Sequence, residues 1–364
     1  MKMHRHVVLT SIIIVILLAA LALFFFWIEE TIPQNNEAEN TPDEVVIDNS
    51  QEPEDQLYLT IMTHMEQSFM DDKDEDVFLE HVEQLRYAME LAQEVGAILS
   101  IESEKPFAIA NRAWSVPILR EILEHGHGVQ THCDLGSRYT GVDLTAEEYS
   151  EAFKENKILV DGLIGEENNI GCSGGAGIND WVTAASLAGF KYLNGIVAGH
   201  LLAMDYENRP GEKWTDDYIS NEGWHDNLPE DLYESIYPIP LADSNDLIAD
   251  DDPVIIIMSG TIGPLYYQYE DGDLCIKNGN CELTSEDIDT AVSTILDIAE
   301  HYDSERGVAK ITIYVQSVLY DEENEMVLKY FFSEMAKLEE QNIIQFGTHK
   351  EIYEAYIEQT GFDL

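Results

Sequence analysis

Residues 57–67 read Leu-Tyr-Leu-Thr-Ile-Met-Thr-His-Met-Glu-Gln, and this stretch decides the fold. Residues 57–63 are apolar, aromatic or β-branched, which is typical of a strand buried in a sheet. After a polar segment, apolar residues recur at steps of four and three from about Asp74 to Val95, which predicts one face of a helix. These apolar positions are Phe78, Val82, Leu85, Met89 and Ala92. A strand followed by an amphipathic helix is the repeating unit of an α/β protein.

The same unit recurs along the chain. Further strands are predicted at 97–101, 129–132, 170–172, 191–197, 236–241, 254–258, 310–315 and 343–346, and helices at 116–124, 146–164, 180–187, 285–302, 325–340 and 350–358. Residues 254–258 are apolar throughout, as in parallel strands that helices cover on both faces. About seven or eight strands alternating with helices over roughly 300 residues favour an irregular (β/α)7-8 barrel over an open sheet.

An apolar run precedes this domain. Residues 7–28 contain only two polar side chains and are long enough to cross a bilayer as a helix, so we predict a transmembrane anchor. A cleaved signal peptide is the alternative, because Ala20-Leu21-Ala22 resembles a small-x-small cleavage site. The anchor is favoured because residues 24–27, Phe-Phe-Phe-Trp, continue the apolar run and suit a membrane interface.

The charges beside the run predict its orientation. Lys2 and Arg5 precede it, which keeps residues 1–6 in the cytoplasm and sends the remainder outside as a single-pass membrane protein with an extracytoplasmic C-terminal domain. Residues 29–56 are rich in acids and contain no Lys or Arg, which predicts a disordered linker. Residues 57–364 then form the barrel domain.

The overall charge excludes one class of partner. The 364 residues include 19 Lys and Arg against 71 Asp and Glu, a formal charge of −52. Nucleic-acid binding depends on clustered Lys and Arg, so we expect no nucleic-acid partner. At 45% hydrophobic residues the chain can nevertheless bury a core.

Two strand ends carry residues that can bind a metal. His64 and Glu66 follow the first strand, and His132 and Asp134 follow the third. Residues two apart on a strand point to the same side, and the loops at the carboxyl ends of barrel strands form one rim. Two imidazoles and two carboxylates suit zinc or another divalent metal with one position open for water.

With these motifs in this order, the chain resembles the polysaccharide deacetylase (NodB-homology) superfamily. The resemblance rests on the order of Thr63-His-Met-Glu66, the segment His125-Gly-His-Gly-Val-Gln-Thr-His-Cys-Asp134, Cys172-Ser-Gly-Gly175 and the helix 180–190, and it runs from about Leu57 to the C-terminus. It implies a distorted (β/α) barrel that removes acyl groups from N-acetylated sugars with a divalent metal. It also implies that His132 is the first metal histidine, that His127 is a buried histidine preceding it, and that His64 or Glu66 stands in the aspartate-pair motif.

The chain departs from the family pattern in three places. Gly136 stands where the second metal histidine would be, so Asp134 would have to replace it. His64 takes the place of the catalytic aspartate, and residues 313–317 on the penultimate strand contain no general-acid histidine. These departures keep a catalytically inactive barrel, binding a glycan or an envelope partner, as the alternative function.

If the chemistry is retained, the resemblance implies a role for each site residue. Glu66, His132 and Asp134 would hold the ion, with zinc the expected metal, and His64 would accept a proton from water. His200 or His225 would donate a proton to the leaving amine. The expected function is hydrolysis of N-acetyl groups on cell-envelope glycans. A glycosidase that uses Glu66 and Asp134 is a third possibility.

The four cysteines can form disulfides if the domain lies outside the cytoplasm. Outside the cytoplasm we expect a disulfide between Cys275 and Cys281, which bracket a predicted turn, and Cys133 and Cys172 can form a second one at neighbouring strand ends. Four cysteines allow three pairings, and the sequence does not choose among them.

Overall fold

The computed structural model describes residues 57–133, 141–228, 231–267, 283–362 and 364. Its principal strands are β1 (Leu57–His64), β2 (Leu99–Ser103), β3 (Gly128–His132), β4 (Gly171–Ser173), β5 (Tyr192–Asn194), β8 (Ile239–Leu241), β9 (Ile255–Met258), β10 (Thr261–Pro264), β11 (Ala309–Tyr314) and β12 (Gln345–Phe346). Its longer helices are α2 (Glu75–Val95), α3 (Lys105–Ala113), α4 (Ile118–Glu124), α5 (Ala146–Ile164), α6 (Trp181–Leu187), α10 (Ser285–His301), α11 (Glu325–Glu340) and α12 (His349–Thr360). The predicted anchor and acidic linker lie outside the described residues. Within the described ranges, no helix combines the length and apolarity that crossing a bilayer requires.

The strands form one mainly parallel sheet, as the strand-helix alternation predicts. Its order is β10-β11-β1-β2-β3-β4-β5-β9-β8, with β12 also paired to β1. Every pairing along this order is parallel except that between β8 and β9. The expected α/β fold with a parallel central sheet is therefore confirmed, and the carboxyl ends of β1 to β5 lie at one edge.

A glycine allows two consecutive strands, β9 and β10, to pair with strands that lie far apart in the strand order. β9 pairs with β5, and β10, which begins three residues after β9 ends, pairs with β11. Gly260 lies between the two strands at φ +75°, and its carbonyl oxygen accepts a hydrogen bond from the Thr312 amide at 2.8 Å. A Cβ atom at this position would collide with the carbonyl oxygen of Lys310. The close approach thus requires glycine, and it brings the two ends of the strand order together.

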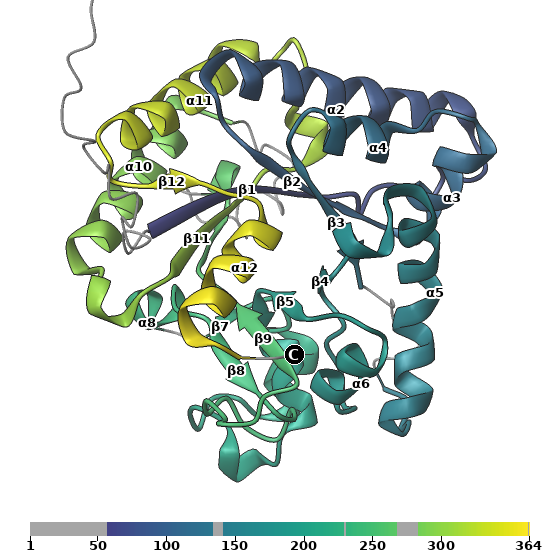
Figure 1. Cartoon of the computed structure of the whole chain (residues 1–364), viewed down its shortest axis with the longest axis vertical. Coiled ribbons are helices and arrows are strands. Elements are labelled where there is room, and N and C mark those ends of the chain that lie inside the picture. Colours follow the sequence, from purple (N-terminus) through teal and green to yellow (C-terminus); the bar gives the residue numbers. More distant parts are fainter. Residues whose placement is uncertain (1–56, 134–140, 229–230, 268–282, 363) are drawn as a thin grey trace, which may run out of the picture. The chain divides into compact units, whose positions relative to one another are not determined.

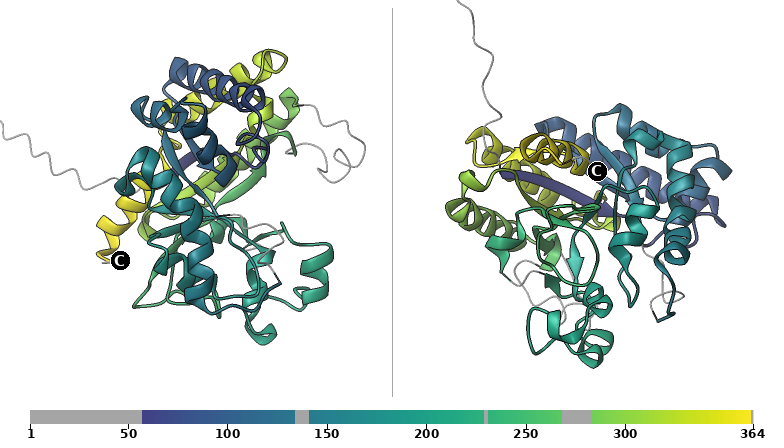
Figure 2. Two further views of the ribbon diagram at one scale, coloured as in Figure 1. Left: turned by 90° about the vertical axis from the view of Figure 1, so that its right-hand side faces the viewer. Right: turned by 60° about the horizontal axis from the view of Figure 1, so that its bottom comes forward.

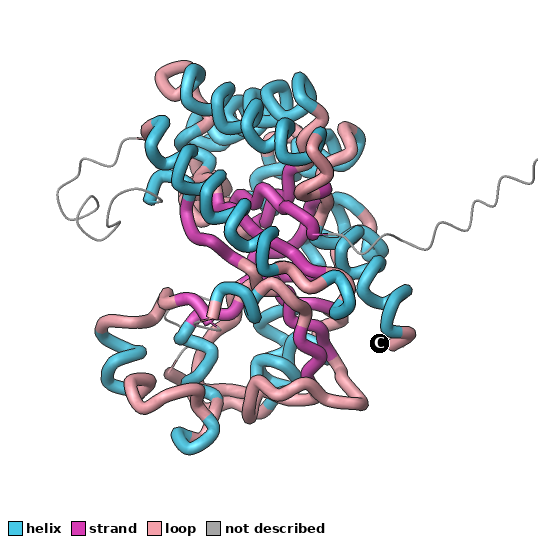
Figure 3. Tube along the Cα trace, turned by 90° about the vertical axis from the view of Figure 1, so that its left-hand side faces the viewer, coloured by secondary structure: helices cyan, strands magenta, loops and turns pink. Residues whose placement is uncertain are grey.

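Helices cover the outside of the strands. Figure 1 shows α2 and α11 running together beside the strands, with α5 beside β3 and β4, and Figures 2 and 3 show the strands enclosed between helices. Asp74 caps the start of α2 with a side chain that accepts hydrogen bonds from two backbone amides, and Gly96 caps its end in the left-handed conformation. The apolar positions predicted for its inner face, Phe78, Val82, Leu85, Met89 and Ala92, are all buried.

Candidate metal and catalytic site

The first strand brings a histidine and a glutamate to the sheet edge. His64 is the last residue of β1, and Glu66 follows two residues later. Nδ1 of His64 lies 3.2 Å from Oε1 of Glu66. The Glu66 side chain is 46% exposed and that of His64 is 15% exposed, so solvent reaches this pair.

His132, the last residue of β3, joins this pair. Its Nε2 lies 3.4 Å from Oε1 of Glu66, and its ring centroid is 4.4 Å from that of His64. Three of the four residues predicted for the rim therefore converge, while Asp134 lies outside the described residues. Their assigned roles stay predictions.

A third strand supplies a buried carboxylate that the sequence analysis missed. Glu102 is the parallel-register partner of His64 in the pairing of β1 with β2, and its side chain is fully buried. Oε2 of Glu102 lies 2.8 Å from Nε2 of His64 and 3.4 Å from Nδ1 of His132. Glu102 therefore lies beneath both imidazoles.

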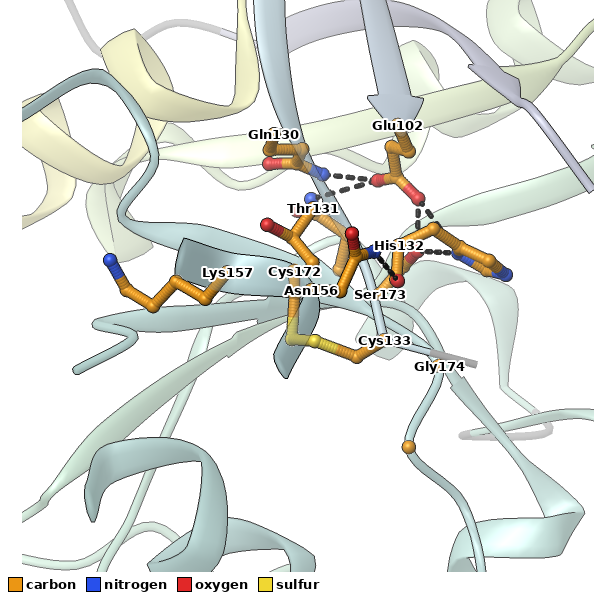
Figure 4. Close-up of a disulfide and its surroundings, with 12 residues drawn as sticks. Glu102, Gln130, Thr131, His132, Cys133, Asn156, Lys157, Cys172, Ser173 and Gly174 are labelled. Carbon is orange, nitrogen blue, oxygen red and sulfur yellow. Dashed lines mark hydrogen bonds and ion pairs between the residues drawn. A yellow bond between two sulfur atoms is a disulfide. The ribbon is translucent and has the colours of Figure 1, made fainter. Parts of the chain in front are cut away.

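Neutral donors surround the Glu102 carboxylate. Gln130 Nε2 and Ser173 Oγ both donate hydrogen bonds to it, and Asn194 Nδ2 donates at 3.2 Å. Ser173 also lies 2.6 Å, Oγ to Nδ1, from His132 (Figure 4). Since these donors come from β3, β4 and β5, the carboxylate links strands that are far apart in the sequence.

The charges in this group stabilise one another. Burial alone would raise the pKa of Glu102, but the charges and hydrogen bonds of His64 and His132 outweigh burial and hold the pKa well below its usual value. The pKa of Glu66 is lowered for the same reason, because hydrogen bonds from both histidines outweigh its partial burial. Conversely, burial would lower the pKa of His132, but Glu102 and Glu66 raise it well above the usual value. The metal-free group therefore favours imidazolium rings paired with carboxylates.

Two more side chains, Glu104 and Tyr314, lie beside the two histidines. Oε1 of Glu104 lies 3.8 Å from Nε2 of His132. On β11, the ring of Tyr314 lies 4.8 Å from that of His64. Burial, together with the charge of Glu66, raises the pKa of Tyr314, so its hydroxyl keeps its proton at physiological pH.

The donor set fits a divalent ion. His64, Glu102 and His132 each offer one ligand atom, and these atoms lie within 4.8 Å of one another. In the metal-free group Nε2 of His64 instead pairs with Oε2 of Glu102 at 2.8 Å. Imidazole nitrogens and carboxylate oxygens gathered this closely are suitable ligands for zinc.

The predicted acid residues are not in this group. His200 is buried, and its ring packs edge-on against Trp181. Its two ring nitrogens face backbone atoms, Nδ1 those of Val197 and Nε2 the carbonyl oxygen of Gly174 at 3.3 Å. Burial lowers its pKa from 6.5 to about 4, so the ring is neutral at pH 7. This geometry favours a structural role over the predicted acid role, and His225 is exposed on the surface.

Beneath Glu102 lie two more buried bases that sequence reasoning did not find. Nδ1 of His349 lies 3.8 Å from Oε1 of Glu102. Nζ of Lys310 donates to the carbonyl oxygen of Met258 at 2.8 Å, and burial lowers the Lys310 pKa to about 7. No motif marks either residue, although a lysine in the apolar strand 309–314 is a signal that it faces polar partners inside the fold.

A disulfide links the end of β3 to β4 beside the site. Cys133 and Cys172 are bonded, with Cα atoms 5.8 Å apart, directly after His132 and before Ser173 (Figure 4). This is one of the pairings that the sequence left open, while Cys275 and Cys281 lie outside the described residues. Asn156 on α5 donates to the carbonyl oxygen of His132 at 2.9 Å. Covalent and hydrogen bonds thus hold the end of β3 in place.

No protein-family profile and no curated protein sequence matches the chain. Solved structures do resemble it. A protein assigned as a polysaccharide deacetylase from Mycobacterium smegmatis aligns over 84% of this chain and 93% of its own, with a TM-score of 0.51 and 11% identity. The Puue allantoinase aligns over 89% of this chain and 100% of its own, with a TM-score of 0.52 and 13% identity. At these identities the similarity shows the fold alone, and the chain shares its fold with the structure assigned as a polysaccharide deacetylase.

Proposed function

We propose that this protein is a metal-dependent hydrolase that removes N-acetyl groups from cell-envelope glycans. The observation that carries the proposal is the convergence of His64, Glu66 and His132 at the carboxyl ends of parallel strands, the edge at which barrel enzymes place their reactive residues. The fold shared with a polysaccharide deacetylase supports the reaction class as an analogy.

In this proposal His132 and Glu102 from that group, together with the neighbouring Glu66, are the principal ligand candidates, and His64 is left to move a proton. Zinc is the expected ion because imidazole and carboxylate ligands suit it. When bound, the ion would polarise the amide carbonyl of the substrate and make water a stronger nucleophile. Asp134 stays a predicted ligand.

His64 would move the proton. Burial lowers its pKa, but Glu102 and the hydrogen bonds of its neighbours raise it more, so the ring is a stronger base than an ordinary histidine. With Glu66 bound to the ion, Nδ1 of His64 would be free to accept a proton from water, and Glu102, 2.8 Å from Nε2, would stabilise the imidazolium form that results. The same ring would then return the proton to the leaving amine, since a base near neutrality serves both steps. This assignment replaces His200 as the acid.

We further propose that the domain works outside the cytoplasm, attached by residues 7–28. The disulfide between Cys133 and Cys172 supports this location, because such bonds persist in oxidising compartments.

A second candidate is a glycan-binding barrel without turnover. Two observations favour it. Both ring nitrogens of His200 face backbone atoms, and β11 carries a tyrosine and no histidine.

Metal analysis tests whether the site binds a divalent ion. The full-length chain, purified in detergent without chelator, loaded with zinc and dialysed to remove the excess, should retain about one ion per chain, and His132→Ala should lose it. His301→Ala is the matched control, because His301 is an exposed histidine on α10. An unsubstituted protein that binds no divalent ion would refute the metal-dependent mechanism.

Product analysis tests the reaction. Incubation with chitooligosaccharides and peptidoglycan fragments should release acetate without shortening the chains, and His64→Gln should lower that rate by at least about 100-fold. Shortened chains would indicate a glycosidase. Binding without any product would favour the inactive barrel.

A further inference from the structure

Glu104 repeats, at the end of β2, the spacing that places Glu66 beside His64 at the end of β1. It lies two residues after Glu102, and its backbone is extended, with φ −68° and ψ 157°. Residues two apart on extended backbone point to the same side, and both carboxylates indeed lie beside the His132 ring. The end of β2 thus contributes one carboxylate that is fully buried and one, Glu104, that is 18% exposed.

The position of Glu104 at the start of a helix is unusual for a glutamate. It is the N-cap residue of α3, where Ser, Thr, Asp and Asn are preferred because their short side chains accept hydrogen bonds from the first amides. The Glu104 side chain makes no such capping bond. Its Oε1 instead lies 3.8 Å from Nε2 of His132. A residue that departs from the local preference and faces a candidate site indicates a role in that site.

Hydrogen bonds select which nitrogen of His132 is free for an ion. The Ser173 hydroxyl donates to Glu102, so its oxygen accepts from Nδ1 of His132, 2.6 Å away (Figure 4). Oε2 of Glu102 lies 3.4 Å from the same Nδ1. Histidines that bind metals commonly donate their other ring N–H to a partner of this kind. The ligand atom of His132 is therefore Nε2, on the opposite side of the ring from Glu102.

Two carboxylate oxygens lie near this Nε2. Oε1 of Glu66 is 3.4 Å from it, and Oε1 of Glu104 is 3.8 Å from it. Two ligands bound about 2.1 Å from a tetrahedral zinc ion lie about 3.4 Å apart. Glu66 is thus already at the separation of a second ligand, and Glu104 reaches it by a shift of a few tenths of an ångström.

One buried amide fixes the spacing between the strand ends that carry Glu104 and His132. Asn156 on α5 donates from Nδ2 to the carbonyl oxygen of Ser103 at 2.8 Å and to that of His132 at 2.9 Å. Both partners are acceptors, so the NH₂ group of the amide must face them. The ladder between β2 and β3 ends at the pair of Ser103 with Thr131, and Asn156 links the two strands beyond it. The amide therefore holds the two backbones together where the candidate ligands begin.

We propose that Glu104 is a metal ligand, which holds the ion together with Glu66 and Nε2 of His132. Three protein ligands leave the fourth position of a tetrahedral ion open, as in catalytic zinc sites. Glu102 then supports the site from the Nδ1 side of His132, and Asn156 is a positioning residue. This inference rests on the metal dependence in the proposed function, and it replaces Glu102 with Glu104 among the ligand candidates.

Zinc affinity tests the proposal. The full-length chain in detergent is titrated with zinc against a dye of known zinc affinity. Glu104→Gln should weaken binding by at least about 100-fold, because loss of a residue that only supports a ligand already costs about 10–100-fold. Glu104→Asp keeps the charge but draws the oxygen back by about 1.5 Å, one bond length, so it should weaken binding too. Glu155→Gln is the matched control, because Glu155 is an exposed carboxylate that pairs with Lys105, and its affinity should be unchanged.

Asn156→Ala tests the positioning role. It should weaken zinc binding about tenfold, because the two strand ends are no longer linked. Asn111→Ala is its control, since Asn111 is also buried and its side chain also joins two backbone groups, the carbonyl oxygen of Phe107 and the amide of Leu119. Both variants should lose free energy of unfolding, but Asn111→Ala should bind zinc as the unsubstituted chain does. Equal zinc affinities of the two variants would show that Asn156 is only structural.

The outcomes separate this ligand from the proposed function. If the unsubstituted chain binds zinc and Glu104→Gln, folded by circular dichroism, binds it as tightly as Glu155→Gln, Glu104 is not a ligand and the proposed function stands. If Glu104→Gln does not fold, Glu104→Asp decides in the same way. An unsubstituted chain that binds no zinc overturns the ligand and the proposed function together.

Discussion

Oε2 of Glu102 lies 2.8 Å from Nε2 of His64, and the two residues are direct register partners on neighbouring parallel strands. Glu102 is fully buried, so its charge is stabilised by the histidines and by neutral donors instead of water. The candidate site therefore extends inward from the rim to a carboxylate inside the fold.

Removing this carboxylate should destabilise the domain. Glu102→Ala leaves His64 and His132 without their counter-charge, and breaking such a buried pair costs about 3–5 kcal/mol of unfolding free energy. Urea denaturation followed by circular dichroism measures the loss. Glu155→Ala, which breaks an exposed pair with Lys105, should cost less than about 1 kcal/mol. Equal costs for the two variants would contradict the central position of Glu102.

Metal binding should stabilise the same domain. An ion that binds only the folded chain adds about 2.7 kcal/mol to the unfolding free energy when present at 100 times its dissociation constant. Thermal unfolding with zinc, and again after chelation by EDTA, measures this difference. The shift should disappear in His132→Ala and persist in His301→Ala. A shift that survives His132→Ala would place the ion elsewhere.

Acid should destabilise the domain through His200. Its pKa is about 4 when folded and near 6.5 when unfolded, so between these values the unfolded chain binds more protons. The stabilisation is therefore complete above pH 6.5 and is lost as the pH falls toward 4, by at most about 3 kcal/mol. His200→Gln should flatten the dependence of unfolding free energy on pH in this window, whatever its effect at pH 7. An unchanged slope would show that another group causes the acid sensitivity.

The disulfide should stabilise by restricting the unfolded chain. Cys133 and Cys172 are 39 residues apart, and closing a loop of this length corresponds to about 4 kcal/mol in the chain-entropy treatment. The double variant Cys133→Ala/Cys172→Ala should lose most of this in urea denaturation. A double variant as stable as the unsubstituted protein would mean that the bond does not form in solution.

Gly260 should be sensitive to substitution because of its surroundings. Gly260→Ala places a Cβ atom against the Lys310 carbonyl oxygen, so the strands must separate, and we expect a loss of at least about 3 kcal/mol. Gly96→Ala is a matched control, because Gly96 has a similar φ of +78° with no atom near the added Cβ, and should cost only about 1–2 kcal/mol. If both variants lose the same free energy of unfolding, the collision with the Lys310 carbonyl oxygen does not contribute.

Local patterns in the sequence were enough to predict the strand-helix alternation and three members of the site. His64, Glu66 and His132 are predictable because each lies at or just after the end of a recognisable strand, and parallel strands bring their carboxyl ends to one edge. The apolar face of α2 was predictable for a similar reason, since its spacing depends only on helical geometry.

The tertiary structure alone decided what lies beneath that edge. Glu102, Lys310 and His349 come from β2, β11 and the start of α12, and nothing in their local sequence shows that they meet. It also decided that His200 faces backbone atoms, and that Cys133 pairs with Cys172. The physical reason is that register and packing are set by the whole chain, whereas strand and helix periodicities are set by neighbouring residues.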